Sequence, residues 1–325
     1  MIFVYFREKN NVLCRVLGEN ESISEEAIWV DVRNPDETDI AIIETQLAIK
    51  IPSENEIWKN HVLNRFYIED DKAYMTAALI TKTDSPHPGT ASTTFILAPK
   101  FLLTVHDIDP TSFRNFTARL VNSNEVFPTS YHVLEGLMEE MITRVAYNSE
   151  IVVETLDDIS HNIFGNEDGD KKGKSASQKM KTILRRLGAV ADLNSKINES
   201  LHSLNRMLVF FKQIATSDTQ VNERTDILLA DVNALTTQTA FLSDKITFQL
   251  DALLGMINVE QNLIIKIFSV VAVFFLPPTL VSSVYGMNFQ HMPELSLTYG
   301  YPVAISLMLF SALLPFLYFK MKGWL

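Results

Sequence analysis

The sequence predicts an α+β domain at the start of the chain, then long α-helices, and finally two C-terminal transmembrane helices. Three observations predict this order. Short β-branched and aromatic runs alternate with turns over residues 1–109. After Pro110, apolar residues recur at helical spacing, and two long apolar runs lie near the C-terminus.

The N-terminal part contains the strand and turn signals. One helix is expected over residues 36–49, entered through Asp36 after Pro35, because aspartate is a favoured N-cap. Each of five runs is expected to form a strand: 3–6, 12–17, 27–32, 65–81 and 93–108. We assign residues 1–125 to this cytoplasmic α/β domain.

Helical spacing then continues to the end of the chain. It covers residues 111–121, 131–164 and 176–214, and it resumes from about Asn222 with no proline before Pro277. The last segment, taken to residue 284, predicts a helix of roughly 94 Å that joins the cytoplasmic part directly to the membrane. We expect an acidic helical hairpin over 126–221 and a stalk over 222–263.

Two apolar segments are long enough to cross a bilayer. Residues 264–284 and 302–319 reach roughly 27–32 Å as helices, and Lys266 is their only charged residue. The connector 285–301 has no lysine or arginine, whereas Lys320 and Lys322 lie in the tail 320–325. The positive-inside rule therefore places both termini in the cytoplasm. The single cysteine and the absence of a leader pattern agree with a reducing compartment.

The first apolar segment carries a seam of small or polar side chains. Two helices cannot enclose a polar path, so a pore would require an oligomer in which each copy contributes this helix. Tight helix packing explains the seam equally well. Its members are Asn262, Ser269, Ala272, Leu276, Thr279 and Ser283.

The charge balance excludes nucleic acid as an expected partner. The net charge is −11, and the membrane part contributes few charged residues, so the cytoplasmic part is strongly acidic and would repel phosphates. A solvated helix face and a cation-concentrating surface both explain the acidic residues of the first long helix. These are Glu135, Glu139, Glu140, Glu150, Glu154, Asp157 and Asp158.

No catalytic or cofactor motif is present. The loop 165–175 imitates a phosphate-binding loop and a calcium loop, but it lacks the first glycine of the former and the closing glutamate of the latter. The histidines show no zinc-ligand spacing. We therefore expect neither an enzyme nor an organic cofactor.

A dense motif follows the first apolar segment. Tyr285-Gly286-Met287-Asn288-Phe289 precedes Met292-Pro293-Glu294-Leu295 and Gly300-Tyr301-Pro302, and the chain ends in YFKMKGWL. With the LPPTLV run of the first apolar segment, this pattern resembles the CorA family of divalent-cation channels. The resemblance is dense over about 250–325 and is one of architecture over 1–250.

The resemblance implies a funnel-shaped homopentamer in the bacterial inner (plasma) membrane, with an α/β/α sandwich-like cytoplasmic domain. It implies a channel that takes up magnesium and also passes cobalt and nickel. A selectivity ring of Gly286, Met287 and Asn288 is implied, in which Asn288 amides and Gly286 carbonyls hold the hydrated ion while Met287 packs. Neutral oxygens suit this role because Mg²⁺ loses its water reluctantly.

The resemblance also places residues along the pore. Asn262 and Thr279 would offer oxygens, and Ile265 and Leu276 would form apolar constrictions. Asp251 would form a ring near the cytoplasmic exit, although an exposed stalk charge explains it too. Where some family members have an acidic residue, this chain has Gln290, so Glu294 alone is expected to attract cations in the outer loop.

The implied mechanism is passive entry driven by the membrane potential and closed by intracellular Mg²⁺ that bridges carboxylates of neighbouring subunits. Asp231, Asp226 and Asp84 are the regulatory candidates. Two alternatives remain: a zinc-transporting relative of the same family, and a cytoplasmic cation sensor that the apolar hairpin anchors to the membrane.

Overall fold

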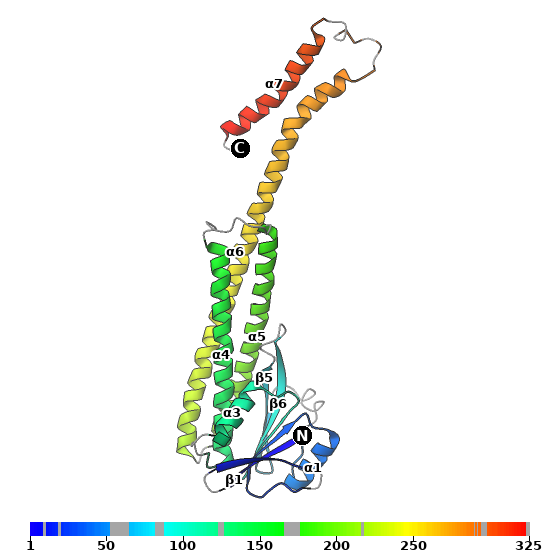
Figure 1. Cartoon of the computed structure of the whole chain (residues 1–325). Coiled ribbons are helices and arrows are strands. Elements are labelled where there is room, and N and C mark those ends of the chain that lie inside the picture. Colours follow the sequence, from blue (N-terminus) through cyan, green and yellow to red (C-terminus); the bar gives the residue numbers. More distant parts are fainter. Residues whose placement is uncertain are drawn as a thin grey trace. The chain divides into compact units, whose positions relative to one another are not determined.

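The structure is a computed structural model of the whole chain (Figure 1). It describes residues 1–8, 11–18, 21–52, 65–81, 88–122, 127–165, 176–215, 218–288, 290, 292–293 and 298–322. The chain divides into two compact units, Met1–Leu250 and Asp251–Leu325. We call them the N-terminal unit and the C-terminal unit and describe each by itself.

The N-terminal unit begins with a seven-stranded mixed sheet. The strand order is β2-β1-β3-β7-β6-β5-β4, and every neighbouring pair is antiparallel except β3 and β7, which are parallel. The strands are β1 Ile2–Glu8, β2 Asn11–Val16, β3 Ala27–Arg33, β4 Phe66–Glu69, β5 Lys72–Thr81, β6 Gly89–Leu97 and β7 Leu102–His106. The expected α+β composition is confirmed.

Two runs expected as single strands are hairpins instead. Residues 65–81 fold back at Asp70 and Asp71, whose φ values of 47° and 60° lie in the left-handed region. Aspartate tolerates this region better than most residues, so the pair forms a tight turn between β4 and β5. Residues 93–108 likewise split into β6 and β7, with a backbone hydrogen bond of 2.9 Å from Ala98 to Phe101 closing the turn.

Helices cover both faces of this sheet. Helix α1, Glu37–Leu47, starts at a capping box in which the Asp36 carboxylate accepts from the Asp39 amide at 2.7 Å, as the sequence predicts. Its Ile43 belongs to the apolar cluster formed with Val30 and other buried residues. On the opposite face, Trp29 stacks on Tyr5 and packs against α3, Thr111–Asn122. The layering is that of an α/β/α sandwich.

Three long helices follow. They are α4, Ser130–Phe164, α5, Ala176–Ile214, and α6, Thr219–Tyr285, the last a single helix of 67 residues as the sequence predicts. In the N-terminal unit they pack through buried apolar side chains and a few polar ties. Asn194 Nδ2 donates to the Thr239 carbonyl at 3.0 Å, and Gln249 Nε2 donates to the Leu156 carbonyl at 2.9 Å. These ties join α5 and α4 to the first half of α6.

Candidate functional site

The C-terminal unit consists of the last part of α6 and of α7, Gly300–Met321. Both helices are long and apolar enough to cross a bilayer. In a single chain their large apolar side chains lie outside: Phe268 is 70% exposed and Leu309 is 67% exposed. A core helix of a soluble protein would bury such residues, so this surface fits lipid or other copies of the chain.

The residues that the family resemblance assigns to a pore share one face of α6. At 100° per residue, Asp251, Asn262, Ile265, Leu276 and Thr279 fall within an arc of about 100°. Helix α6 continues through Pro277 and Pro278, so the geometry of one helix applies to the whole set. From Asn262 to Thr279 this face rises about 25 Å, close to the thickness of the hydrocarbon core.

The hydroxyl groups near this face donate hydrogen bonds to backbone carbonyls of the same helix. Thr279 Oγ1 donates to the carbonyls of Phe275 and Leu276 at 2.9 Å, and Ser269 Oγ donates to the Ile265 carbonyl at 2.8 Å. Each hydroxyl oxygen keeps lone pairs that are directed away from the backbone. Such oxygens can accept hydrogen bonds from the water shell of a hydrated cation.

Helix α6 ends where the Gly-Met-Asn motif begins. The Gly286 amide donates to the Ser282 carbonyl at 3.0 Å, and the Met287 amide donates to the Val284 carbonyl at 3.2 Å. A Cβ added at Gly286 would lie 3.2 Å from the Ser282 carbonyl oxygen, so glycine lets the chain leave the helix tightly. Backbone amides thus close this turn, and Asn288 follows it directly.

Of the three regulatory candidates, the structure describes two. Asp226 forms an ion pair with Lys212 of the same chain, and Asp231 is exposed on α6. Asp84 lies outside the described residues, as does Glu294 of the outer loop. Among the described residues of this single chain, no three acidic, histidine or cysteine side chains gather into a metal-binding cluster.

Several acidic residues of α4 contact cations of their own chain. Arg119 of α3 lies 2.9 Å from Glu139 and 3.4 Å from Glu140. Farther along α4, Lys245 of α6 lies 2.6 Å from Asp157, and this hydrogen bond and charge hold the pKa of Asp157 below its usual range. The acidic stretch is therefore partly neutralised within the chain, which weakens it as a cation-concentrating surface.

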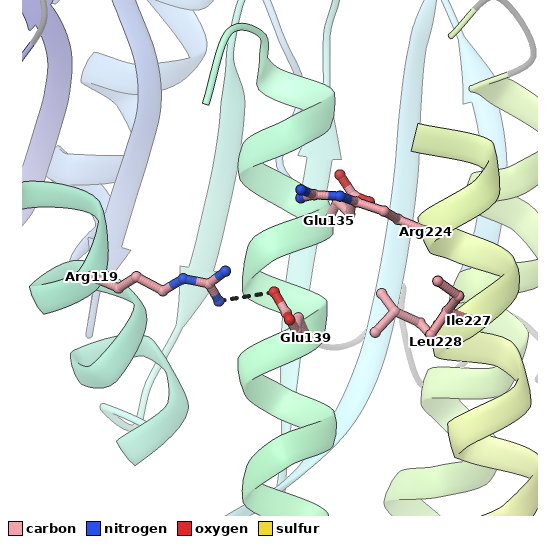
Figure 2. A pocket seen from close by; sticks show the side chains of 6 residues that line it. All are labelled: Arg119, Glu135, Glu139, Arg224, Ile227 and Leu228. Atoms are coloured by element: carbon pink, nitrogen blue, oxygen red, sulfur yellow. Dashed lines mark hydrogen bonds and ion pairs between the residues drawn. The ribbon is translucent and has the colours of Figure 1, made fainter. Parts of the chain in front are cut away.

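A pocket of about 340 Å³ opens beside these residues in the N-terminal unit (Figure 2). Glu135 and Glu139 lie one turn apart on α4, with Arg119 on one side and Arg224 of α6 on the other. This pocket could not be predicted from sequence patterns, because its two arginines come from helices far apart in the chain. Two guanidinium groups beside two carboxylates disfavour a cation here.

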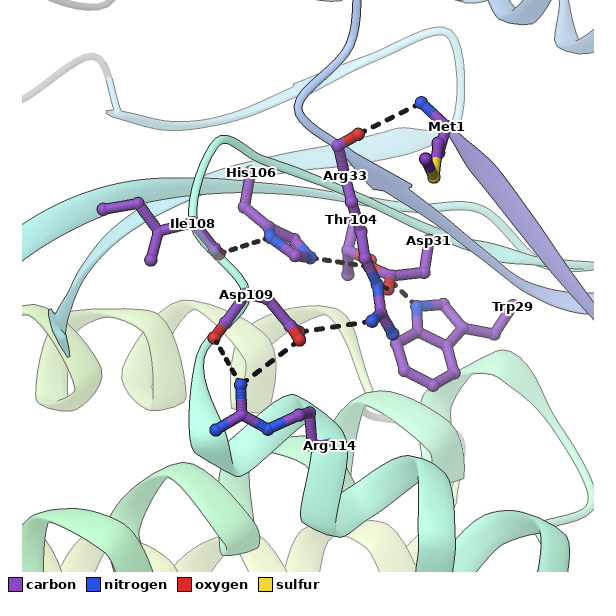
Figure 3. Close-up of polar contacts among 9 residues, drawn as sticks. All are labelled: Met1, Trp29, Asp31, Arg33, Thr104, His106, Ile108, Asp109 and Arg114. Atoms are coloured by element: carbon purple, nitrogen blue, oxygen red, sulfur yellow. Dashed lines mark hydrogen bonds and ion pairs between the residues drawn. The ribbon is translucent and has the colours of Figure 1, made fainter. Parts of the chain in front are cut away.

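A second buried polar cluster joins the two parallel strands (Figure 3). Asp31 of β3 is fully buried and accepts from Thr104 at 2.6 Å, from His106 Nε2 at 2.9 Å and from Arg33 at 2.7 Å. The other ring nitrogen of His106 lies 2.6 Å from the Ile108 carbonyl. The His106 ring therefore bridges the Asp31 carboxylate and the Ile108 carbonyl.

This cluster is internally satisfied. Burial alone would raise the pKa of Asp31, but the hydrogen bond and charge of His106, with Thr104 and Arg33, hold this pKa below its usual range. Arg33 also pairs with Asp109 at 3.3 Å, which extends the network to the start of α3. The ends of parallel strands often bind ligands, but here the side chains bind one another and fix the two strands.

Comparisons with known proteins show the family of the chain. A family model described as "CorA-like Mg2+ transporter protein" matches residues 24–321. The magnesium transport protein CorA of Escherichia coli (strain K12) is 32% identical over 320 residues, which cover 98% of this chain and 99% of that protein. The protein of the same name from Yersinia pseudotuberculosis serotype I is 33% identical over 321 residues, with the same coverage.

A solved structure supports the fold. The complete CorA magnesium transporter from Methanocaldococcus jannaschii is similar with a TM-score of 0.74 at 16% identity, covering 100% of this chain and 99% of that one. At this identity the likeness shows the fold alone. The family model and the two sequence relatives span both units of the chain, including the motif at residues 286–288.

Proposed function

We propose that this chain, which belongs to the CorA family of Mg²⁺ transporters, assembles as a homopentameric channel that admits hydrated Mg²⁺ down the membrane potential. The observation that carries this proposal is the face of α6 on which Asn262, Ile265, Leu276 and Thr279 align before the helix ends at Gly286. Five such helices around one axis would line a path in which two apolar rings lie between two polar rings.

Selectivity resides at the mouth of this path. Five Asn288 side-chain amides and the Gly286 carbonyls would form a ring of neutral oxygens around the ion. Because Mg²⁺ holds its water tightly, these oxygens would bind the water shell rather than replace it. Met287 packs beside the ring and does not contact the ion. The tight exit from α6 at Gly286 supports this arrangement.

The driving force requires no nucleotide. A divalent ion that crosses 100 mV gains roughly 4.6 kcal/mol, since each charge gains about 2.3 kcal/mol. Rings of Ile265 and Leu276 would stop hydrated ions by dewetting when they are narrow. The Asp251 ring would then attract cations near the cytoplasmic exit. Both termini lie in the cytoplasm and the hairpin crosses the bacterial inner membrane, as the positions of its lysines support.

Intracellular Mg²⁺ closes the channel in this proposal by bridging carboxylates of neighbouring subunits. Asp231, Asp226 and Asp84 remain the candidates for these sites. Asp226 would have to exchange Lys212 for the ion, which makes the exposed Asp231 the better-placed of the two that the structure describes. In the outer loop, Glu294 attracts cations, and Gln290 makes this capture weaker than a carboxylate there would.

A flux experiment with blockers tests the proposal. The full chain is reconstituted in liposomes, and entry of Mg²⁺, Co²⁺, Ni²⁺ and Zn²⁺ is followed under an inside-negative potential, with and without a hexammine cation that mimics hydrated Mg²⁺. Potential-driven Mg²⁺ entry that the hexammine cation blocks is expected, with Co²⁺ and Ni²⁺ as further substrates. Preferential Zn²⁺ entry would favour the zinc-transporting alternative. An intact oligomer that passes no ion would favour the membrane-anchored sensor.

A further inference from the structure

An apolar groove lies between the two helices of the C-terminal unit. It has a volume of about 230 Å³. Its walls include Val270, Val271 and Phe274 from α6 and Pro315, Phe316 and Phe319 from α7. Compact ligands occupy pockets of roughly 300–1,000 Å³ that carry a few polar groups. A smaller groove with apolar walls suits a segment of hydrocarbon chain.

Lysines stand at one end of this groove. Lys266 lies one turn before Val270 on α6, and Lys320 directly follows Phe319 on α7, so each lies just beyond the last groove residue of its helix. The chain reverses direction between α6 and α7, and both lysines therefore mark the same end. Lys322 directly follows the end of α7, and residues 251–325 contain no other lysine or arginine.

The groove does not face the proposed ion path. At 100° per residue, its residues on α6 are centred on the order of 160° from the face that carries Asn262, Ile265, Leu276 and Thr279. When that face lines the axis of an oligomer, the groove is directed outward. The hydrocarbon of the bilayer is the medium on that side.

We propose that this groove holds one acyl chain of an anionic phospholipid whose phosphate binds between Lys266 and Lys320. Lysines at the end of a membrane helix extend their ammonium groups to the headgroup level, where phosphates lie. The combination of a dry groove and a cationic end matches both parts of such a lipid. This inference rests on the proposed membrane insertion of the hairpin, but not on the ion path.

Lipid retention by the full-length protein tests the inference. The protein is purified in neutral detergent and titrated with phosphatidylglycerol or with phosphatidylcholine of the same acyl chains, and bound lipid is counted by native mass spectrometry. Each lysine near an anionic surface contributes roughly a fivefold preference. The wild type is therefore expected to retain much more phosphatidylglycerol, and Lys266→Gln with Lys320→Gln to lose this preference.

A second pair of variants separates the groove from the charge. Val271→Trp fills the groove and leaves the lysines, so retention of both lipids is expected to fall. Val273→Trp adds the same bulk to α6 away from the groove and is the matched control, with retention unchanged. The same spectra report the mass of the oligomer, which shows whether each variant has assembled.

Three outcomes would overturn the inference. The wild type could retain both lipids equally, or the double lysine variant could keep the preference. Val271→Trp could also change the oligomeric mass while lipid retention stays the same, which would make the groove a contact between copies. Failure of the proposed channel is seen separately, as absent Mg²⁺ flux, because lipid retention does not depend on ion passage.

Discussion

In the N-terminal unit the chain buries its own large apolar side chains, whereas in the C-terminal unit it presents them outward. Trp29, Phe95 and Phe211 are fully buried, but Leu276 is 64% exposed in the single chain. The N-terminal unit thus contains the contacts that stabilise it. In the proposed assembly, lipid and other copies of the chain cover the surface of the C-terminal unit.

The two units also differ in the number of their charged residues and in what these residues contact. In the N-terminal unit, carboxylates such as Glu139 and Asp157 pair with cations from other helices of the same chain. In the C-terminal unit, charged residues are few, and Lys266, near the start of its span, is the only one within the two long apolar stretches. In the proposed channel this arrangement separates stability from conduction, because hydroxyl oxygens such as that of Thr279 keep lone pairs for the water shell of an ion.

The largest expected effect comes from removing a buried aromatic ring. Trp29→Ala removes a side chain that stacks on Tyr5 and packs on Phe116, so the free energy of unfolding of the N-terminal unit should fall by about 3–5 kcal/mol. Leu309→Ala in α7 is the matched change at an outward position and should leave this unit unchanged. Chemical denaturation in detergent, followed by circular dichroism, measures the free energy of unfolding of both variants. Equal losses in the two variants would contradict the contrast between the units.

The next effect concerns the buried Asp31. Asp31→Asn leaves His106 and Arg33 without their carboxylate and should cost on the order of 3 kcal/mol of unfolding free energy. The pKa of Asp31 is lower in the folded chain than in the unfolded chain. As pH falls, the Asp31 carboxylate is therefore protonated in the unfolded chain first, which favours unfolding. This contribution is therefore complete above about pH 4 and is lost in more acidic solution.

Denaturation of the wild type and of Asp31→Asn from pH 3 to pH 7 measures this dependence. The wild type should lose stability towards acid more steeply than the variant, so that the two curves converge. Parallel curves would contradict the role given to Asp31. Thr38→Ala, at the exposed start of α1, is the control, and its stability should fall towards acid as steeply as that of the wild type.

The smallest effect comes from two glycines in long helices. A Cβ at Gly136 of α4 would lie 2.7 Å from both Phe116 and Phe127, so Gly136→Ala should destabilise the N-terminal unit by about 1–3 kcal/mol. A Cβ at Gly255 of α6 meets no atom within 4 Å. Gly255→Ala should be neutral or should stabilise the helix by up to about 1 kcal/mol. Thermal unfolding distinguishes them, and a reversed order would show that the tight packing lies elsewhere.

Patterns of local spacing predicted much of this structure. The long helices, the cap at Asp36 and the two apolar helices follow from periodicity, capping chemistry and hydrophobic length, all of which are local. The turn at Asp70 and Asp71 was missed because it interrupts what otherwise looks like one strand. The adjacent aspartates were the available signal for a turn, because aspartate tolerates the left-handed region of backbone conformation.

Contacts between distant residues could not be predicted in the same way. His106 lies 75 residues from Asp31 in the sequence, and only the parallel pairing of β3 with β7 brings them together. Spacing along this one helix predicted a seam of small or polar side chains, whereas the pore roles of Ile265 and the other residues of the aligned face came from the family resemblance. The regulatory carboxylates could not be predicted from local spacing, because the proposal places their partners on another copy of the chain.

The most direct test of the central claim is Mg²⁺ entry into liposomes under an inside-negative potential, compared among the wild type, Asn288→Ala and Gln290→Ala. Gln290 lies two residues beyond the motif and serves as the matched control. We expect the wild type and Gln290→Ala to admit Mg²⁺, and Asn288→Ala to lose selective entry while keeping its oligomeric state. Entry through Asn288→Ala with unchanged rate and selectivity would contradict the claim that Asn288 holds the hydrated ion.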